Sequence, residues 1–303
     1  MQFREVILHF AKKNKNRFQL IRTLSGLMDF PQSINMEFKL QKNLYYLISK
    51  YGGKIVMRED LVKVKRSDRV FILGCGDSIN KMKSNKFDHI RMHNSISIGP
   101  WFYHSFIPDI CTLELSNRFN VKYSKREKFL LKKLENYSTN YFSTIFLLKS
   151  RIPHDLITDG IYKTISTRYN FNWVDTRIIF SETRFNLILT IFILNLFKFF
   201  KSRTKFIQYK GSLIWSILIA YNMGFKEIIL CGIDLKGNYF FDQGQKPTDR
   251  EHSSLTKSRS SLNLIESVLT FEKYLLRKRG VKLLINSENL AFIGKLPEYQ
   301  GWS

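Results

Sequence analysis

Residues 210–242 constrain the fold of this chain most, because a helix, a glycine stop and a buried strand follow one another there. Gly211-Ser212 opens a run in which apolar residues recur at helical spacing. Gly224 then stands where glycine commonly ends a helix. The short apolar run 228–231 leads into Gly232-Ile233-Asp234. This pattern predicts an α–β unit with a carboxylate at the carboxyl end of a parallel strand, the edge where open α/β sheets bind ligands.

A second strand runs into a glycine turn earlier in the chain. Residues 69–73, RVFIL, are followed directly by Gly74-Cys75-Gly76-Asp77-Ser78. The first such turn of a Rossmann-like fold holds phosphate with backbone N–H groups and the helix dipole. Asp77 or Ser78 is suited to cap the helix that follows. The pattern is less specific than GxGxxG, and a tight turn without a ligand explains it equally well.

Strands and helices alternate from residue 69 onward. Besides the two strands above, we predict strands over residues 89–98, 108–115, 144–148 and 281–285. Asn94 lies at or near the polar end of the first of these. The alternation predicts an α/β fold with one Rossmann-like domain and a mostly parallel sheet over residues 69–303. We expect residues 1–68 to form a basic helical extension and residues 151–205 a lid or membrane-proximal insertion.

The net charge of +24 requires an anionic partner or a basic, solvated surface. Basic residues are spread along the chain and no helix-turn-helix, RRM or zinc signature is present, which argues against nucleic acid. An anionic membrane surface attracts each nearby basic residue with a free energy of roughly 1 kcal/mol. The apolar run 185–200 is too short to span a membrane comfortably. It predicts either a buried helix or one that lies in the membrane surface.

Three cysteines without CxxC spacing favour a reducing cytoplasm over a disulfide framework or zinc site. The histidines share no spacing that suggests a metal cluster. His252 stands out because it lies in the polar loop 243–257, soon after Asp234. A neutral imidazole is a natural base near neutral pH, although most lone surface histidines have no catalytic role.

These residues together resemble the bacterial sialyltransferases of glycosyltransferase family 42. The likeness extends over residues 210–285 and, more weakly, over 69–116; some flagellin glycosyltransferases are similar at the same points. It is carried by Gly74–Ser78 after a strand, Gly211-Ser212 at a helix start, residues 224–228, Gly232–Asp234, Tyr239 and His252-Ser253. The resemblance implies a GT-A-type variant of the Rossmann-like domain. It also implies a CMP-linked nonulosonic acid as donor, with inversion and without a metal or other cofactor.

The resemblance also implies a role for each matching residue. His252 deprotonates the acceptor hydroxyl, Tyr239 binds the departing phosphate, and Ser212 binds the sugar carboxylate at a helix amino terminus. The residues that surround the nucleotide are Gly74, Gly76, Asn94, Gly232 and Asp234, with Cys75, Ser78 and Gly211 in the same turns. The absence of an Asp-x-Asp pair at a strand end fits a metal-independent reaction or a monophosphate donor.

The chain departs from the family pattern at three points. Cys75 replaces an asparagine, and Lys236 stands where a second tyrosine is expected. A lysine would neutralise a leaving phosphate as a phenol would donate to it. The asparagine of the third strand is missing, with Glu114 or Asn117 nearby. These changes leave room for Kdo, another nonulosonate or a donor without CMP.

We therefore predict an inverting, metal-independent glycosyltransferase that acts on a surface glycan such as lipooligosaccharide or capsule. It would be cytoplasmic and peripheral to the inner face of the cytoplasmic membrane, with a homo-oligomer left open. One alternative is another nucleotide-dependent transferase on the same fold, with a different sugar donor or a pyrophosphokinase-like reaction. A basic nucleic-acid-binding protein is the second.

Overall fold

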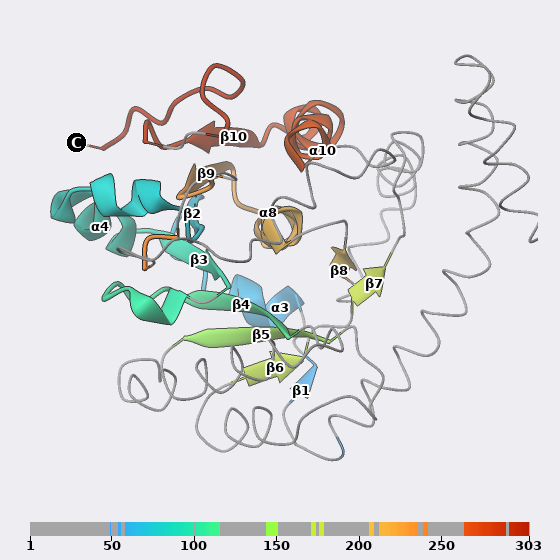
Figure 1. Ribbon diagram of the computed structural model, residues 1–303. Helices are drawn as coiled ribbons and strands as arrows, with labels where there is room; N and C mark the ends of the chain where they lie inside the picture. The colour runs from blue at the N-terminus through green and yellow to red at the C-terminus, as the bar shows by residue number, and fades with distance from the viewer. Residues whose placement is uncertain are drawn as a thin grey trace, which may run out of the picture.

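The computed structural model describes part of the chain, and the predicted α/β class with a mostly parallel sheet is confirmed within it. The described residues are 49, 54–55, 58–99, 101–115, 144–150, 171–173, 176–178, 206–208, 212–234, 239–241, 264–288 and 291–302. They form a sheet with helices on both faces (Figure 1). Within these ranges, no helix combines the length and apolar character needed to cross a membrane.

The main sheet has eight strands in the order β1-β6-β5-β4-β3-β2-β9-β10, and every neighbouring pair is parallel. Its strands are β1 (Lys54–Ile55), β2 (Arg69–Leu73), β3 (Asn94–Ile98), β4 (Ile110–Leu115), β5 (Ile145–Ser150), β6 (Phe171–Trp173), β9 (Glu227–Cys231) and β10 (Lys282–Ile285). A separate two-stranded parallel sheet pairs β7 (Thr176–Ile178) with β8 (Phe206–Gln208).

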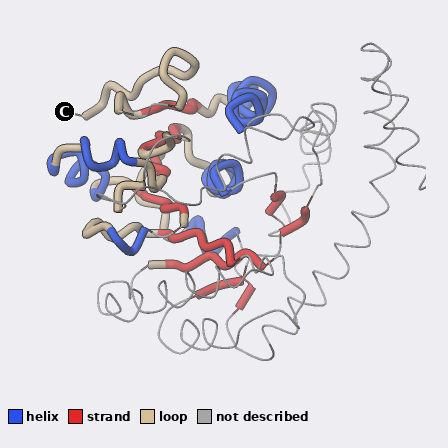
Figure 2. The backbone as a smooth tube through the Cα atoms, viewed as in Figure 1, coloured by secondary structure: helices blue, strands red, loops and turns tan. Residues whose placement is uncertain are grey.

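Helices cover both faces of the sheet (Figure 2). The α-helices are α3 (Arg58–Val62), α4 (Ser84–Arg91), α8 (Ser212–Asn222) and α10 (Leu264–Phe271). A π-helical turn, η5 (Glu272–Leu276), extends α10, and the 3-10 helices are η1 (Asp77–Lys81), η2 (Trp101–Tyr103) and η6 (Arg277–Arg279). The predicted helix over 212–222 and the strand over 228–231 are confirmed.

Two cores form on opposite faces of the central strands. On one face, Val70 and Ile72 of β2 pack with α8 and α10, and all side chains from Leu213 to Ala220 are buried. On the other face, Phe71 and Leu73 pack with α4 and the C-terminal segment. Strands that are buried on both faces read as continuous apolar runs, which explains why β2 and β9 could be recognised in the sequence.

The direction in which the chain adds strands reverses beside β2. Strands β3, β4 and β5 are added successively on one side of β2, whereas β9 returns to its other side. β2 and β9 pair in register from Arg69 opposite Glu227 to Leu73 opposite Cys231. Ligands of open α/β sheets bind outside the carboxyl ends of the strands at such a switch point. The fold therefore directs attention to the turns that follow Leu73 and Cys231.

The predicted strand over residues 89–98 is wrong in its first half. Residues 84–91 form α4, and the strand begins only at Asn94. Phe87 and Ile90 are buried three residues apart on one side of this helix. Ile90 and Met92 continue the alternation of Ile96 and Ile98 towards the amino terminus, which produced the misassignment.

The sheet extends beyond the predicted domain limits. Strand β1 pairs with β6, and Leu61 of α3 belongs to the core, so residues before the predicted boundary at residue 68 are part of the domain. β6 itself comes from the predicted insertion, residues 151–205. The helix expected over the apolar run 185–200 lies outside the described residues.

Candidate functional site

Two glycine turns meet at the switch point. The N–H of Gly74 donates to the carbonyl of Cys231, and the N–H of Gly76 donates to that of Gly232, both at 2.8 Å. A Cβ added to Gly74 would lie 2.5 Å from the oxygen of Gly232, and one added to Gly232 would lie 2.5 Å from the oxygen of Gly74. Gly232 also has φ +68°, which favours glycine. The glycines are therefore needed for the close approach of the turns that follow β2 and β9.

This contact corrects the predicted role of the first turn. The amides of Gly74 and Gly76 are engaged with the second turn, so they do not serve as the phosphate donors that the sequence predicted. The predicted cap is also wrong. Gly76 is the N-cap residue of η1 and has no side chain to cap it, so neither Asp77 nor Ser78 is the cap.

Ser78 and Asp234 hold the two turns together. The carboxylate of Asp234 accepts from the Ser78 N–H at 2.8 Å and from its hydroxyl at 2.6 Å. Both residues are buried, with 1% of Ser78 and 5% of Asp234 exposed. Hydrogen bonds to a buried carboxylate are strong, so this pair forms a clasp between the start of η1 and the end of β9.

Residues 239–241 lie against the first glycine turn and are called the aromatic strap below. Tyr239 forms an antiparallel bridge with Gly76, and the N–H of Phe240 donates to the carbonyl of Cys75 at 3.1 Å. The side-chain amide of Asn80 donates to the carbonyl of Phe240 at 3.0 Å. The strap therefore places Tyr239 beside the turn with which the sequence associated it.

Cys75 faces inward. Its thiol donates to the carbonyl of Ile98, at the end of β3, over 3.1 Å, and 9% of the residue is exposed. The other two cysteines are fully buried, and burial raises the pKa of Cys111 to about 12 and that of Cys231 well above its ordinary value. Thiols of this kind are poor nucleophiles, so cysteine chemistry is not a feature of this site.

Ser212 is the first residue of α8 and is half-buried. Because α8 leads through Gly224 into β9, it runs antiparallel to the strands and begins at their carboxyl edge. One turn later, the hydroxyl of Ser216 lies 3.3 Å from that of Thr112 on β4. The amino terminus of α8 therefore lies at the same edge as the glycine turns, where its dipole favours an anion.

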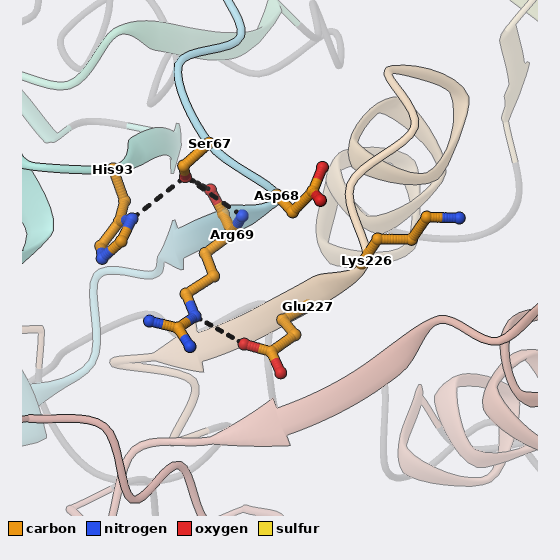
Figure 3. A pocket seen from close by; sticks show the side chains of 6 residues that line it. All are labelled: Ser67, Asp68, Arg69, His93, Lys226 and Glu227. Atoms are coloured by element: carbon orange, nitrogen blue, oxygen red, sulfur yellow. Dashed lines mark hydrogen bonds and ion pairs between the residues drawn. The ribbon is translucent and has the colours of Figure 1, made fainter.

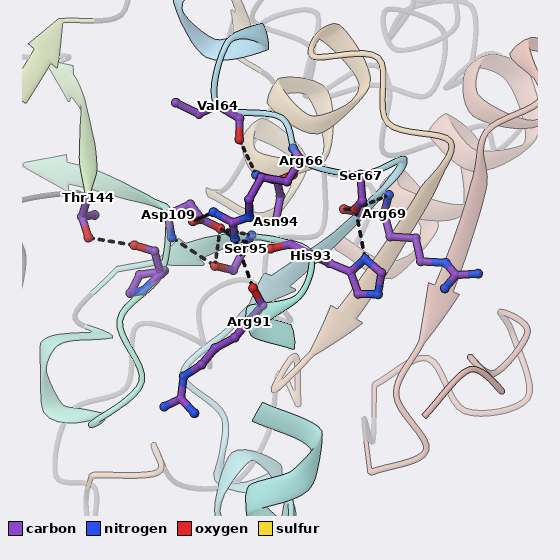
Figure 4. Close-up of polar contacts among 11 residues, drawn as sticks. Val64, Arg66, Ser67, Arg69, Arg91, His93, Asn94, Ser95, Asp109 and Thr144 are labelled. Carbon is purple, nitrogen blue, oxygen red and sulfur yellow. Dashed lines mark hydrogen bonds and ion pairs between the residues drawn. The ribbon is translucent and has the colours of Figure 1, made fainter. Parts of the chain in front are cut away.

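Asn94 lies at the opposite edge (Figure 4). It is the first residue of β3 and pairs with Val70, near the start of β2. Its side chain is buried; it accepts from the N–H of Arg66 at 2.7 Å and donates to the carbonyl of Val64 at 2.7 Å. The prediction that Asn94 ends its strand at the nucleotide is wrong, because this residue fastens residues 64–66 to the sheet.

A hollow of about 430 Å³ opens at this amino edge (Figure 3). Its charged groups largely pair with one another: Arg69 Nε donates to Glu227 Oε2 at 2.6 Å. Burial opposes ionisation of Glu227, but hydrogen bonds from Arg69 and Lys282 leave its pKa below the ordinary value. The hollow is lined by Ser67, Asp68, Arg69, His93, Lys226 and Glu227. It lies at the amino ends of the strands, opposite the edge where open α/β sheets bind ligands.

The structure thus brings most of the predicted site together at the carboxyl edge. The residues gathered there are Gly74, Cys75, Gly76, Ser78, Ser212, Gly232, Asp234 and Tyr239. Gly211, Lys236 and His252 lie outside the described residues. Within the described ranges, no group of three or more histidine, cysteine, aspartate or glutamate side chains could hold a metal ion.

Sequence reasoning missed the aromatic residues around the strap. Phe240 is buried and makes edge contacts with Trp101 and His104, at ring-centroid distances of 5.2 and 5.5 Å. Trp101-Phe102-Tyr103 and Tyr239-Phe240-Phe241 are both visible as aromatic runs. The aromatic composition of these two runs could have drawn attention to them, but nothing in the sequence indicates that they are in contact.

A parallel sheet with two glycine turns at its switch point defines a Rossmann-like fold. The chain matches no family model and no curated protein. Among solved structures it is similar to the sialyltransferase CstII from Campylobacter jejuni, in complex with a substrate analogue, cytidine-5′-monophosphate. The identity is 17% and the TM-score 0.43, over 78% of this chain and 85% of that one.

Two further structures are similar to a comparable degree. The monofunctional α-2,3-sialyltransferase Cst-I from Campylobacter jejuni is 12% identical with a TM-score of 0.42, over 76% of this chain and 80% of that one. The MAf glycosyltransferase from Magnetospirillum magneticum AMB-1 is 13% identical with a TM-score of 0.43, over 84% of this chain and 36% of that one. Because these TM-scores are below 0.5, the functional assignment rests on the geometry of the site.

Proposed function

We propose that this chain is a glycosyltransferase that moves a sialic-acid-like sugar from a CMP donor to a hydroxyl group of a surface glycan. The observation that carries the proposal is the meeting of the two glycine turns at the switch point, with Tyr239 bridged to Gly76. A nucleotide would lie in the crevice outside these turns. The sequence likeness to family 42 over residues 210–285 supports CMP as that nucleotide.

The reaction is a single displacement. The acceptor oxygen attacks the anomeric carbon, and the bond from that carbon to the phosphate oxygen breaks, so that CMP leaves with the electron pair. His252 takes the proton of the acceptor hydroxyl. Attack from the face opposite the leaving group inverts the anomeric configuration.

The site residues stabilise the charges that develop during this step. Tyr239 donates a hydrogen bond to the leaving phosphate, and Lys236 adds a positive charge beside it. Ser212, at the amino terminus of α8, holds the carboxylate of the sugar. The Ser78–Asp234 clasp fixes the turn beside the nucleoside. A phosphate monoester leaving group carries less charge than a diphosphate, so we propose that side chains suffice without a metal.

The proposed acceptor is a lipooligosaccharide or capsular glycan at the inner face of the cytoplasmic membrane. The net charge of +24 supports a peripheral association with anionic lipid. Assembly into a homo-oligomer would be compatible with this role.

A screen of nucleotide sugars for donor hydrolysis tests the proposal. We expect release of CMP from CMP-sialic acid, CMP-Kdo or a related CMP-linked acid, and a rise in melting temperature with CMP. Release from a UDP-linked sugar alone would favour another transferase on the same fold. No release from any CMP donor, together with no thermal shift by CMP, would remove the proposed donor.

The role of His252 has a separate test. We expect His252→Ala to abolish transfer while CMP affinity, measured by calorimetry, stays within about threefold, because a general base contributes to the chemical step and little to nucleotide binding. His9→Ala, outside the segments that resemble the family, is the control and should keep full activity. Full transfer by His252→Ala would remove this residue from the mechanism.

A further inference from the structure

Three aromatic rings stack in a row across the switch point. The rings of Tyr239 and Phe241 are 5.1 Å apart between centroids with an interplanar angle of 8°. The ring of Tyr103 also stacks on Phe241, at 4.4 Å and 21°. Tyr103 follows β3, whereas Tyr239 and Phe241 follow β9. Since β3 and β9 flank β2, this aromatic stack bridges the strands on either side of the first glycine turn.

The middle residue of the aromatic strap anchors the stack from below. Tyr239 and Phe241 are stacked, whereas Phe240, between them in this turn, is buried against Trp101 and meets Phe241 edge-on at 5.1 Å and 85°. The core therefore holds the base of the stack.

The backbone of Tyr239 is fixed as well. It bridges Gly76, and its neighbour Phe240 is bonded on both sides, to the carbonyl of Cys75 and the side chain of Asn80. With the backbone held, the position of the phenol oxygen depends on the two side-chain torsions of Tyr239. The flat contact with Phe241 restricts both torsions, because rotation of either would break the parallel stack.

We infer that Phe241 and Tyr103 are positioning residues that hold the Tyr239 ring so that its hydroxyl meets the leaving phosphate. This inference rests on the proposed function, in which Tyr239 donates to that phosphate. A displacement of about 1 Å at a reacting group can lower a rate by about 10²-fold. Aromatic stacking is a suitable means of orientation because offset parallel rings attract one another and have a preferred geometry.

Steady-state kinetics on substitutions in the stack test the inference. We expect Tyr239→Phe to lower kcat on the order of 10²-fold, the usual effect of removing one such donor. Phe241→Leu should lower kcat about 10-fold with the KM of the donor within about threefold, because the hydroxyl remains but is poorly placed. Tyr103→Leu should act in the same direction with a smaller effect. Phe241→Tyr and Tyr103→Phe keep a stacking ring and should stay within about threefold of wild type.

The double variant Tyr239→Phe/Phe241→Leu separates positioning from general damage. Without the hydroxyl, the orientation of the ring no longer matters, so its kcat should equal that of Tyr239→Phe alone. A further 10-fold loss in the double variant would overturn the inference, as would an unchanged kcat in Phe241→Leu. If Phe241→Leu does not fold, failure of Phe241→Tyr to retain activity gives the same refutation.

Different results would refute the proposed function and the inference about Phe241 and Tyr103. Absence of turnover with every CMP-linked donor by the wild-type chain would overturn the proposed function, and the inference with it. Turnover that depends on Tyr239 but is indifferent to Phe241→Leu would overturn the inference alone.

Discussion

Gly76→Ala probes the contact on which the whole site depends. Gly76 has φ −71° and ψ 158°, a conformation that alanine adopts freely, so any cost of this substitution is steric. The added Cβ would lie 2.3 Å from Oδ2 of Asp234 and 2.7 Å from the backbone oxygen of Gly232. A side chain could rotate away, but the backbone oxygen moves only if the second glycine turn moves.

The expected cost follows from the bonds that this movement breaks. Separating the turns lengthens the bond from Gly76 to Gly232, worth about 1 kcal/mol, and the two bonds from Ser78 to the buried carboxylate of Asp234, worth roughly 1.5–3 kcal/mol each. Partial relaxation recovers some of this energy. We therefore expect the free energy of unfolding to fall by about 3–5 kcal/mol, at the upper end for a single substitution.

Urea unfolding at pH 7 measures this loss, and calorimetry measures CMP binding under the same conditions. Gly280→Ala is the matched control, because Gly280 has φ +69° and no atom would lie within 4 Å of its Cβ. Its cost is conformational alone, about 1 kcal/mol, and CMP affinity should not change. If Gly76→Ala unfolds no more readily than Gly280→Ala, the close approach of the two turns is not what requires glycine.

Two further predictions concern residues away from the turns. Burial lowers the pKa of His104 to about 4, and its Nδ1 accepts from the N–H of Phe106 at 2.9 Å. Because the folded pKa lies below the ordinary 6.5, its stabilising contribution is present above pH 6.5 and is lost as the pH falls towards 4. We expect the free energy of unfolding to fall by about 2 kcal/mol over this pH range, after allowance for partial exposure. Urea unfolding at several pH values measures the fall, and His104→Gln should remove it. The same pH dependence in the wild type and in His104→Gln would contradict this role of His104. Asn94→Ala breaks two buried hydrogen bonds and should cost about 2–3 kcal/mol in urea unfolding; its CMP affinity should not change, and a tenfold loss would return Asn94 to the site.

The elements that could be predicted are those with a strong local pattern. The strand RVFIL before a glycine turn and the helix that begins at Ser212 can both be recognised from their own residues, without reference to the rest of the chain. Each is buried on all sides, so its composition is dominated by apolar residues. The order of the strands then placed both glycine turns at one edge, so their position at the same end of the sheet could be predicted.

The error at Asn94 arose from a strand boundary. β3 has five residues, about 17 Å from end to end at the usual rise per residue. A boundary error of five residues therefore moves a residue from one edge of a parallel sheet to the other. Here Ile90 and Met92 alternate in step with Ile96 and Ile98, and the periodicity of so short a stretch does not separate helix from strand.

The role of the glycines could not be predicted for a different reason. A glycine turn after a strand indicates that some group approaches the backbone closely, but it does not indicate which group. In this chain the group is the backbone of Gly232, more than 150 residues later, and neither turn carries a local sign of the other. The aromatic stack poses the same problem, since Tyr103 and Phe241 meet only because β3 and β9 flank β2.

The two edges of the sheet differ in the kind of contact that they make, and this difference decides where a ligand fits. At the amino edge, charged side chains pair with one another: Arg69 with Glu227, Arg66 with Asp109 and Lys65 with Asp68. These pairs fasten the turns that enter the strands, and a ligand in the hollow there would have to compete with them. At the carboxyl edge the fastening is done by backbone bonds between glycines and by the buried Ser78–Asp234 clasp. Those contacts are made by backbone groups and by a buried side-chain pair, so the fold at this edge does not depend on exposed charged side chains.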